Sequence, residues 1–321
     1  MALHLVTGGA GFIGSHLVEA LLRRGDSVRV LDDFSTGRRE NLEGADGWRR
    51  EGGGTLDVLE GDIRDAETCR RALDGAEVVF HQAARASVPR SIAEPVATEQ
   101  VNVIGTLNIL MAARQGGARR VVAASSSSVY GASAVLPKSE EMKCEPLSPY
   151  ALSKLGAETY CLMFHALYGL EAVALRYFNV FGPRQDPASQ YAAVIPRFLT
   201  ALLERRRPVV YGTGEQTRDF TFVENVVQAN LLAARVGKEA CGRVFNIACG
   251  RRVSLLELLA LLEKITRCAA DPVHEPACPG DVPHSLASIS QARAVLGYEP
   301  HVGFEEGLQR TAEHFRSKGR A

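Results

Sequence analysis

The stretch TGGAGFIG, residues 7–14, decides the fold of this chain. It follows an apolar run at Leu3–Thr7 and opens a segment of helical period. Glycines spaced as Gly8, Gly11 and Gly14 permit a tight turn, let the backbone approach a pyrophosphate and let the helix pack close to the strand. The N–H groups that begin such a helix can bind the anion. The stretch therefore predicts a strand–turn–helix unit that binds a nucleotide.

The same alternation continues through the first half of the chain. Short runs rich in Val and Leu are separated by amphipathic segments such as Gly14–Arg24 and Val101–Arg114, which is typical of a parallel sheet covered by helices. The runs are apolar enough to be buried on both faces. We expect strands at Leu3–Thr7, Ser27–Asp32, Thr55–Glu60, Glu77–His81, Arg120–Ser125 and Glu171–Tyr177. The pattern predicts an α/β fold with a doubly wound parallel sheet, the Rossmann fold, over residues 1–180.

Prolines and turn glycines become frequent after about residue 180. We expect a smaller C-terminal α/β lobe that holds the substrate, made of residues 181–217 and 251–321. The runs Arg218–Val223 and Val244–Ala248 read as buried strands, so the chain is expected to return to the first domain at about 218–250. Ser254 and Glu257 form a capping box that opens an apolar helix to Ile265.

Composition excludes several classes of protein. The 37 basic residues balance 37 acidic ones, which argues against a nucleic-acid or membrane-surface partner. No apolar run approaches the roughly 18 residues of a membrane span. The seven cysteines are odd in number and include no C-x-x-C pair, so neither a disulfide framework nor a metal site is predicted. The first strand begins too early to leave room for a signal peptide, and we expect a cytoplasmic protein.

Acidic residues end the second and third expected strands. Asp32 and Asp33 lie 18 residues beyond Gly14, where a carboxylate can accept hydrogen bonds from the adenosine ribose and repel a 2′-phosphate. NAD is therefore favoured over NADP. Asp33 could instead cap the following turn. Asp62 ends the third strand at the same sheet edge and is expected to meet the adenine.

Tyr150 and Lys154 lie four residues apart, hence on one face of the helix expected after Pro149. A free phenol has a pKa of about 10 and is a poor base, but a nearby ammonium stabilises the phenolate. The spacing alone also suits an ordinary amphipathic helix. The serine run 125–128 ends the fifth strand, where doubly wound sheets bind ligands, so at least one hydroxyl should face a substrate.

The stretches TGGAGFIGSHL, GDIRD, FHQAA, SSSSVYG, SPYALSK, LRYFNVFGP and RDFTFVENV together resemble the nucleotide-sugar epimerases among the extended short-chain dehydrogenase/reductases, from Leu3 to about Pro300. The resemblance implies that Tyr150 takes the proton of the sugar 4-hydroxyl, that Ser126 bonds to the same hydroxyl and that Lys154 holds the nicotinamide ribose. It further implies a hydride transfer from sugar C4 to NAD, and its return on the other face of the 4-keto sugar.

The resemblance also assigns binding residues. Cofactor contacts are implied for Gly8, Gly11, Phe12, Ile13, Gly14, Asp32, Asp33, Ser35, Asp62, Ile63, Ala83, Ala84, Asn102, Tyr150 and Lys154. Substrate contacts are implied for Ser87, Ser126, Ser127, Tyr150, Asn179, Val194, Tyr211, Arg218, Asp281 and Ser285. The helices Pro95–Arg114 and Pro149–Tyr168 match those that pair into a four-helix dimer interface in relatives, so a homodimer is expected by resemblance.

Three residues bear on the choice of substrate. Related dehydratases and decarboxylases carry acids beside the strand-five hydroxyl, where this chain has serines, which favours epimerisation. Ser285 stands where a tyrosine excludes acetylated sugars in relatives, so the resemblance implies 4-epimerisation of UDP-GlcNAc and UDP-GalNAc, with UDP-glucose and UDP-galactose also accepted. Cys278 replaces an arginine that many relatives use to bind the diphosphate. Arg85 could meet a carboxylate, which leaves UDP-glucuronate 4-epimerase, another nucleotide-sugar-modifying enzyme and a non-catalytic NAD-binding scaffold as alternatives.

Overall fold

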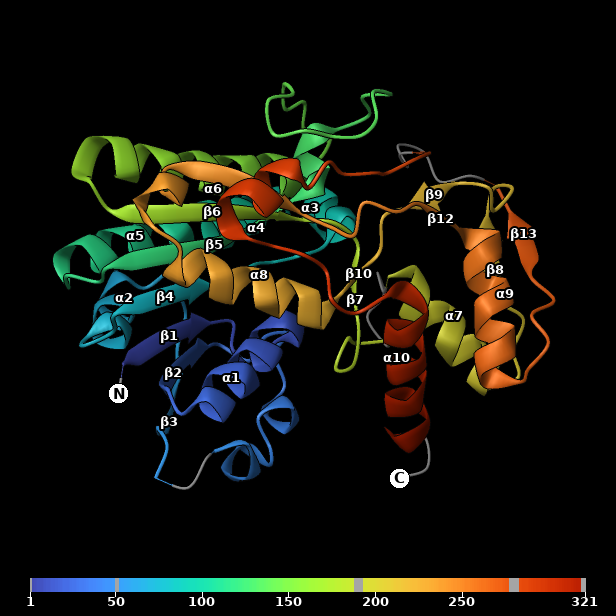
Figure 1. Ribbon diagram of the computed structural model, residues 1–321, viewed down its shortest axis with the longest axis horizontal. Helices are drawn as coiled ribbons and strands as arrows, with labels where there is room; N and C mark the ends of the chain where they lie inside the picture. Colours follow the sequence, from blue (N-terminus) through green and yellow to red (C-terminus); the bar gives the residue numbers. More distant parts are fainter. Residues whose placement is uncertain (1, 50–51, 188–192, 277–282, 319–321) are drawn as a thin grey trace.

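A seven-stranded parallel sheet forms the centre of the computed structural model, which describes residues 2–49, 52–187, 193–276 and 283–318 (Figure 1). Its order is β11-β6-β5-β4-β1-β2-β3, and every neighbouring pair is parallel. The strands are β1 Leu3–Thr7, β2 Ser27–Asp32, β3 Leu56–Glu60, β4 Val78–His81, β5 Arg120–Ser126, β6 Glu171–Tyr177 and β11 Arg243–Ile247. The order reverses direction between β1 and β4, which confirms the doubly wound Rossmann fold.

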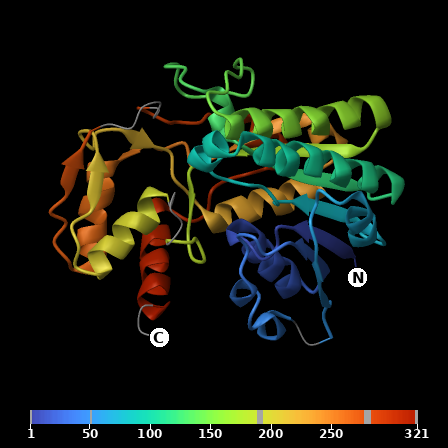
Figure 2. The same cartoon turned by 180° about the vertical axis from the view of Figure 1, so that it is seen from behind.

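Helices cover both faces of this sheet. One face carries α1 Phe12–Arg24 and α8 Val223–Arg235, which contact each other. The other face carries α2 Ala66–Leu73, α5 Gly105–Gln115 and α6 Pro149–Tyr168, and Figure 2 shows α5 and α6 side by side there.

Alternate strand residues supply the two cores. Val6, Val30 and Val122 pack in the cluster that contains the buried side chains of α1 and α8. Their chain neighbours Leu5, Leu31 and Val121 pack with α2 and α5. Because successive side chains of a strand point to opposite faces, near-continuous apolar runs are what a sheet covered on both sides requires.

Three expectations about secondary structure need correction. β3 is the edge strand, and Val58 in it is 40% exposed, so it is not buried on both faces. The expected buried strand Arg218–Val223 is two short strands outside the central sheet, β9 Thr217–Arg218 and β10 Thr221–Phe222. They are separated at Asp219, whose carboxylate bonds to other loops.

The third correction concerns the helix expected at Val101–Arg114. The chain enters it through α3 Val88–Ala93, α4 Pro95–Glu99 and a π-turn, η3 Gln100–Ile104, before α5 begins at Gly105. Gly105 lets the helix approach Ile63 closely, since an added Cβ would lie 2.5 Å from Ile63 Cδ1.

The remaining helices form the C-terminal lobe, to the right of the sheet in Figure 1. They are α7 Val194–Leu203, α9 Leu255–Thr266 and α10 Phe304–Lys318, which contact one another. The short strands of the lobe and its junction are β7 Val180–Phe181, β8 Val209–Tyr211, β12 Val253–Ser254 and β13 Val273–Glu275. Phe181, Phe198, Phe220, Phe222 and Phe304 are buried at the centre of its core.

The capping box at the start of α9 is confirmed, with Glu257 N–H donating to Ser254 Oγ at 3.1 Å and Ser254 N–H donating to Glu257 Oε2 at 2.7 Å. Short 3-10 turns at Arg39–Asn41, Ala45–Trp48, Ser127–Tyr130 and Lys238–Ala240, and a π-turn at Ala292–Leu296, complete the described elements. Among these residues, no helix combines the length and apolarity needed to cross a bilayer.

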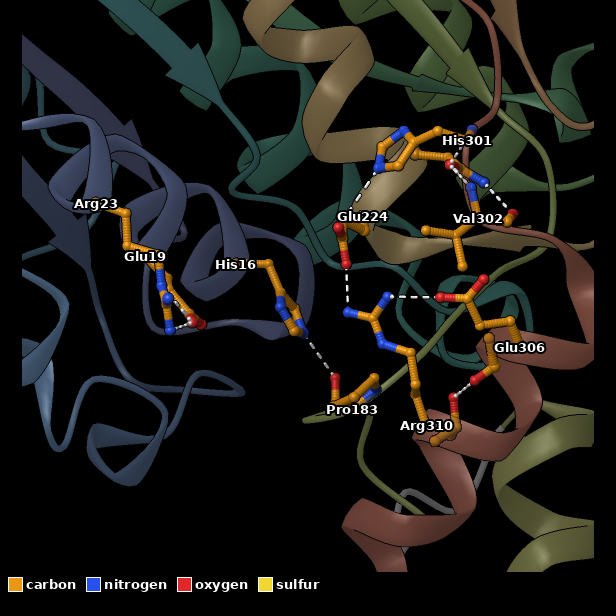
Figure 3. A network of polar contacts seen from close by, with 12 residues as sticks. His16, Glu19, Arg23, Pro183, Glu224, His301, Val302, Glu306 and Arg310 are labelled. Carbon is orange, nitrogen blue, oxygen red and sulfur yellow. Dashed lines mark hydrogen bonds and ion pairs between the residues drawn. The ribbon is translucent and has the colours of Figure 1, made fainter. Parts of the chain in front are cut away.

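Polar contacts link the sheet domain to the lobe (Figure 3). A ring nitrogen of His16, on α1, lies 3.0 Å from the carbonyl oxygen of Pro183. Glu224, at the start of α8, pairs with Arg310 of α10 and with His301. These contacts hold the lobe and the segments next to it against α1 and α8 of the sheet domain.

Candidate active site

The glycine turn leaves no room for side chains. Gly8 has a φ of 66°, and a Cβ on it would lie 2.8 Å from the backbone of Ala83. A Cβ on Gly14 would lie 2.0 Å from the carbonyl oxygen of Gly8. Gly11 caps α1 without any side-chain hydrogen bond, so the first N–H groups of the helix are available to an anion. Phe12 and Ile13 form the first helical positions, and these residues together fit the pyrophosphate of a dinucleotide.

Both acids at the end of β2 shape the turn that follows. Asp32 is buried, and its two oxygens accept the N–H groups of Ala10 and Phe34, each at 2.9 Å. Burial raises its carboxyl pKa, and the two hydrogen bonds oppose that rise. Asp33 is exposed and accepts the N–H and hydroxyl of Ser35 at 3.0 and 2.7 Å. Asp32 and Asp33 therefore both cap this turn, a role that the sequence suggested for Asp33.

Asp62 lies at the same carboxyl edge and pairs with Arg64. The guanidinium Nε donates to Asp62 Oδ2 at 2.8 Å, and this hydrogen bond lowers the carboxyl pKa. The carbonyl oxygens of Ile63 and Arg64 accept the side-chain amide of Asn108, which holds the loop against α5. Asp62 and Ile63 therefore follow β3 at the same edge of the sheet as the acids that end β2.

His81, at the end of β4, connects three segments of this edge. Its Nδ1 lies 2.7 Å from Thr7 Oγ1, and its Nε2 lies 2.9 Å from Thr106 Oγ1. Thr106 donates its proton to the carbonyl of Asn102, so it accepts from Nε2–H. Nδ1 must then accept from Thr7, whose oxygen accepts the N–H of Ala83. The chain of donors is complete with a neutral ring protonated at Nε2.

Asn102 ties the loop after β4 to the helix that carries Tyr150. Its Oδ1 accepts the N–H of Arg85 at 2.8 Å, and its Nδ2 donates to Ser153 Oγ at 2.9 Å. Ser153 donates in turn to the carbonyl of Tyr150. Asn102 lies in the π-turn η3, which aims it into the interior. The segment of Ala83 and Ala84 is held by this side chain and by Thr7.

Tyr150 and Lys154 lie in the first two turns of α6, as predicted. Burial raises the phenol pKa of Tyr150, and the nearby Ser126 hydroxyl lowers it. Lys154 Nζ donates to the carbonyl of Ala124 at 2.9 Å. Burial lowers the pKa of this ammonium to about 8, so it is mostly charged at neutral pH. The structure thus brings Ser126, Tyr150 and Lys154 together at the carboxyl end of β5.

The serine run has divided roles. Ser125 is buried and donates to Glu158 at 2.7 Å. Ser126 ends β5 and accepts the N–H and the hydroxyl of Ser128, at 3.2 and 2.8 Å. Ser127 opens the 3-10 turn beside it. Of this run, Ser126 is the residue whose hydroxyl influences the phenol of Tyr150.

Asn179 and Ser285, two of the expected substrate residues, lie close together in the structure. Asn179 Nδ2 donates to the carbonyl of Asp219 at 3.1 Å and lies 3.4 Å from Ser285 Oγ. Arg218 Nη1 donates to the carbonyls of Thr217 and Pro283. Residues far apart in the chain, after β6, around β9 and near residue 285, are thereby gathered into one cluster.

The buried carboxylate of Asp219 holds this cluster together by hydrogen bonds. It accepts the N–H groups of Cys249, Gly250 and Ala287 at 3.0, 3.1 and 3.2 Å. Burial raises its pKa to about 6, against the effect of these hydrogen bonds. Sequence reasoning missed this residue, although an acid inside an apolar run between Arg218 and Phe220 was a visible signal.

Four other expected substrate residues have different surroundings. Ser87 caps α3 and accepts the N–H of Arg90 at 3.2 Å. Val194 begins α7 and is half-buried. Tyr211 ends β8, with the Arg197 guanidinium 5.2 Å from the centre of its ring. Asp281 lies outside the described residues, as does Cys278.

The site defines a class of protein: a doubly wound dinucleotide-binding domain with a Ser, Tyr and Lys at the carboxyl end of a central strand and a second lobe closing over that edge. The model of the NAD dependent epimerase/dehydratase family matches residues 4–248. The chain belongs to this family, and NAD is its cofactor.

Relatives named for different sugars resemble the chain over nearly its whole length. A UDP-glucose 4-epimerase of Mycolicibacterium smegmatis is 42% identical over 98% of both chains. The UDP-N-acetylglucosamine 4-epimerase from Methanobrevibacter ruminantium M1, in complex with UDP-N-acetylmuramic acid, has a TM-score of 0.92 and 40% identity over 99% of both chains. The UDP-glucuronic acid 4-epimerase from Bacillus cereus, with UDP-glucuronic acid and NAD, has a TM-score of 0.89 and 31% identity, covering 98% of this chain and 99% of its own.

The buried His81 makes stability depend on pH. Burial, with a smaller contribution from Lys154, lowers the His81 pKa to about 3, whereas the unfolded ring titrates near 6.5. Between these two pH values the ring is protonated in the unfolded chain but not in the folded one. The contribution of His81 to the free energy of unfolding is therefore complete above pH 6.5 and is lost as the pH falls. We expect His81→Gln to reduce the slope of unfolding free energy against pH by about 1.4 kcal/mol per unit between pH 4 and 6.

Urea denaturation of wild type and His81→Gln at several pH values measures this difference. Asp219, whose raised pKa has the opposite effect on the pH dependence of stability, is present in both proteins and cancels in the comparison. Parallel curves for the two proteins would contradict the neutral assignment of the ring.

Proposed function

We propose that the chain is a UDP-hexose 4-epimerase that works through a 4-keto sugar, with UDP-GlcNAc and UDP-GalNAc as the preferred pair and UDP-glucose and UDP-galactose as further substrates. The observation that carries the proposal is the meeting of Ser126, Tyr150 and Lys154 at the carboxyl end of β5. The glycine turn and the start of the second lobe lie at the same edge. A sugar hydroxyl and a dinucleotide can therefore reach the same three side chains.

NAD, when bound, supplies acceptance and return of a hydride. Tyr150 receives the proton of the sugar 4-hydroxyl and later gives it back. Ser126 lies near the Tyr150 hydroxyl, so it can hold the reacting hydroxyl of the sugar beside that atom. The charged Lys154 stabilises the phenolate electrostatically and holds the nicotinamide ribose. Asn102 holds the Ala83–Ala84 segment in place, and together they would orient the cofactor.

The neighbours of Ser126 favour epimerisation over elimination or decarboxylation. Ser127 and Ser128 follow it, and neither can serve as an acid or base for removing a group from the sugar. Arg85, which could recognise a uronate, is paired with Glu94 at 2.7 Å. That pairing supports an uncharged hexose over UDP-glucuronate, which stands as the second candidate.

The nucleotide end of the substrate is assigned to the cluster fastened by Asp219. Arg218 has the charge and planar shape to bind a diphosphate, and Asn179 Nδ2 lies 3.4 Å from Ser285 Oγ. The small Ser285 beside Asn179 leaves room for a 2-N-acetyl group. Val194 and Tyr211 complete the proposed binding surface, with Ser87 and Ser127 toward the sugar.

Incubation of the holoenzyme with a panel of UDP-sugars, without added NAD, tests the function. We expect interconversion of UDP-GlcNAc and UDP-GalNAc with no net change in cofactor. Tyr150→Phe should keep its NAD and lose about 100- to 10,000-fold in kcat, because it cannot accept the proton. If no UDP-hexose yields its epimer, the proposed function is wrong; if Tyr150→Phe turns over normally, Tyr150 has no part in it.

Substitution of Ser285 tests the sugar preference. Ser285→Tyr should lower kcat/KM for UDP-GlcNAc by at least about tenfold relative to UDP-glucose, because the larger side chain takes the space of the acetyl group. Ser285→Ala is the matched control and should keep both activities. Equal losses on the two sugars would remove Ser285 from the choice of substrate.

We also propose a homodimer formed through α5 and α6. These helices and the segment before α5 present large exposed apolar side chains, at Val96, Ile104, Met111, Leu152, Met163 and Leu167. Burial of such side chains stabilises association. Sedimentation equilibrium should give twice the chain mass, and Ile104→Glu with Leu167→Glu should give the monomer; a monomeric wild type at micromolar concentration would refute the dimer.

A further inference from the structure

Three residues of α6 interact with three consecutive residues at the end of β5. The helix residues are Tyr150, Lys154 and Glu158, whose spacing of four places them on one face. Tyr150 lies near Ser126, whose hydroxyl lowers the phenol pKa. Lys154 donates to the carbonyl of Ala124, and Glu158 accepts from the hydroxyl of Ser125. The first two contacts belong to the proposed site. The third, at 2.7 Å, is made by a residue to which the proposed mechanism gives no role.

Glu158 forms a buried ion pair with Arg176 of β6. The side chains are 3% and 4% exposed. Arg176 Nη2 donates to Glu158 Oε1 at 2.6 Å, and its Nε donates to Oε2 at 2.9 Å, so the contact is bidentate. Arg176 Nη1 donates to the hydroxyl of Tyr130 at 2.8 Å, and Tyr130 donates to Asn246 Oδ1 of β11 at 2.7 Å. The pair therefore anchors α6 to three neighbouring strands.

Stability is a poor reason to bury these charges. Removing two ions from water costs several kcal/mol, and a well-packed apolar pair of similar volume is often at least as stable. An apolar contact, however, has no direction and would let the helix slide along the strand. A bidentate pair has one geometry, and it is electrically neutral only while both partners are present.

We propose that Glu158 and Arg176 are positioning residues for Tyr150: through Ser125 they set the register of α6 on β5 and keep the surroundings of the reacting phenol neutral. The proposal rests on the proposed function, in which Tyr150 is the base.

The charge of the pair gives it a signature that a structural role lacks. Glu158→Gln keeps the shape of the side chain but leaves the Arg176 charge uncompensated, since a guanidinium does not lose its proton. An added positive charge stabilises the phenolate, so the pKa of Tyr150 should fall, by on the order of one unit. The double variant E158Q/R176M carries neither charge, and its Tyr150 should titrate near the wild-type pH.

The test measures Tyr150 in the holoenzyme by near-ultraviolet difference titration against Tyr150→Phe, together with the pH profile of kcat. For Glu158→Gln we expect both to shift to lower pH, with kcat reduced by about 10- to 100-fold and NAD retained. Titration and pH profile that coincide with wild type would overturn the proposal. The titration needs no substrate, so it remains decisive even if the proposed reaction fails.

Glu171→Gln is the matched control. Glu171 pairs with the buried Arg120 at 2.8 Å on the same two strands, but at their opposite ends, about 16 Å from Ser125 along β5. It should lower the melting temperature and leave the Tyr150 titration unchanged. An equal shift in Glu171→Gln would show a general effect of lost ion pairs and would overturn the assignment.

Ser125→Ala covers the case in which Glu158→Gln does not fold. It removes only the hydroxyl that joins β5 to Glu158 and leaves both charges in place. We expect kcat to fall several-fold with an unshifted pH profile and unchanged NAD content. An unchanged kcat would refute the link between the pair and the register of α6.

Discussion

The close approach of α1 to β1 is the constraint on which the rest of the site depends. A Cβ on Gly14 would lie 2.0 Å from the carbonyl oxygen of Gly8, so glycine at this position is required for the helix to start so close to the strand. Its uncapped N–H groups then face the switch point between β1 and β4, where the crossovers leave in opposite directions. Asp32 strengthens this arrangement because its carboxylate holds Ala10 in the turn.

The polar groups around this edge form a connected set of hydrogen bonds. The neutral His81 is satisfied on both nitrogens by threonine hydroxyls, and Asn102 continues the chain of bonds to Ser153 in α6. Cofactor loop and proposed base are therefore parts of one hydrogen-bonded unit. Such a unit is rigid only while every partner is present, which is why single substitutions far from the reacting atoms are expected to alter chemistry.

The second lobe contributes recognition through a similar principle. Asp219 is buried in an otherwise apolar region and accepts backbone N–H groups from two separate loops. Its own carbonyl meets Asn179, which reaches Ser285. A single carboxylate thereby sets the relative positions of the residues proposed to hold the nucleotide and to discriminate between sugars.

By itself, the sequence determined the doubly wound fold, the nucleotide turn and the helix that carries Tyr150 and Lys154, because glycine spacing, apolar runs and four-residue spacing are local features. The four-residue spacing of Tyr150 and Lys154 continues to Glu158, so the sequence could also have placed Glu158 on this face of the helix. Its partner Arg176, the role of His81 and the cluster around Asp219 were decided only by the tertiary structure, because they join residues that are 18 to 74 positions apart. The prediction of a strand at Arg218–Val223 was wrong for the same reason. A buried acid that bonds to distant loops interrupts a run whose local pattern indicates a strand.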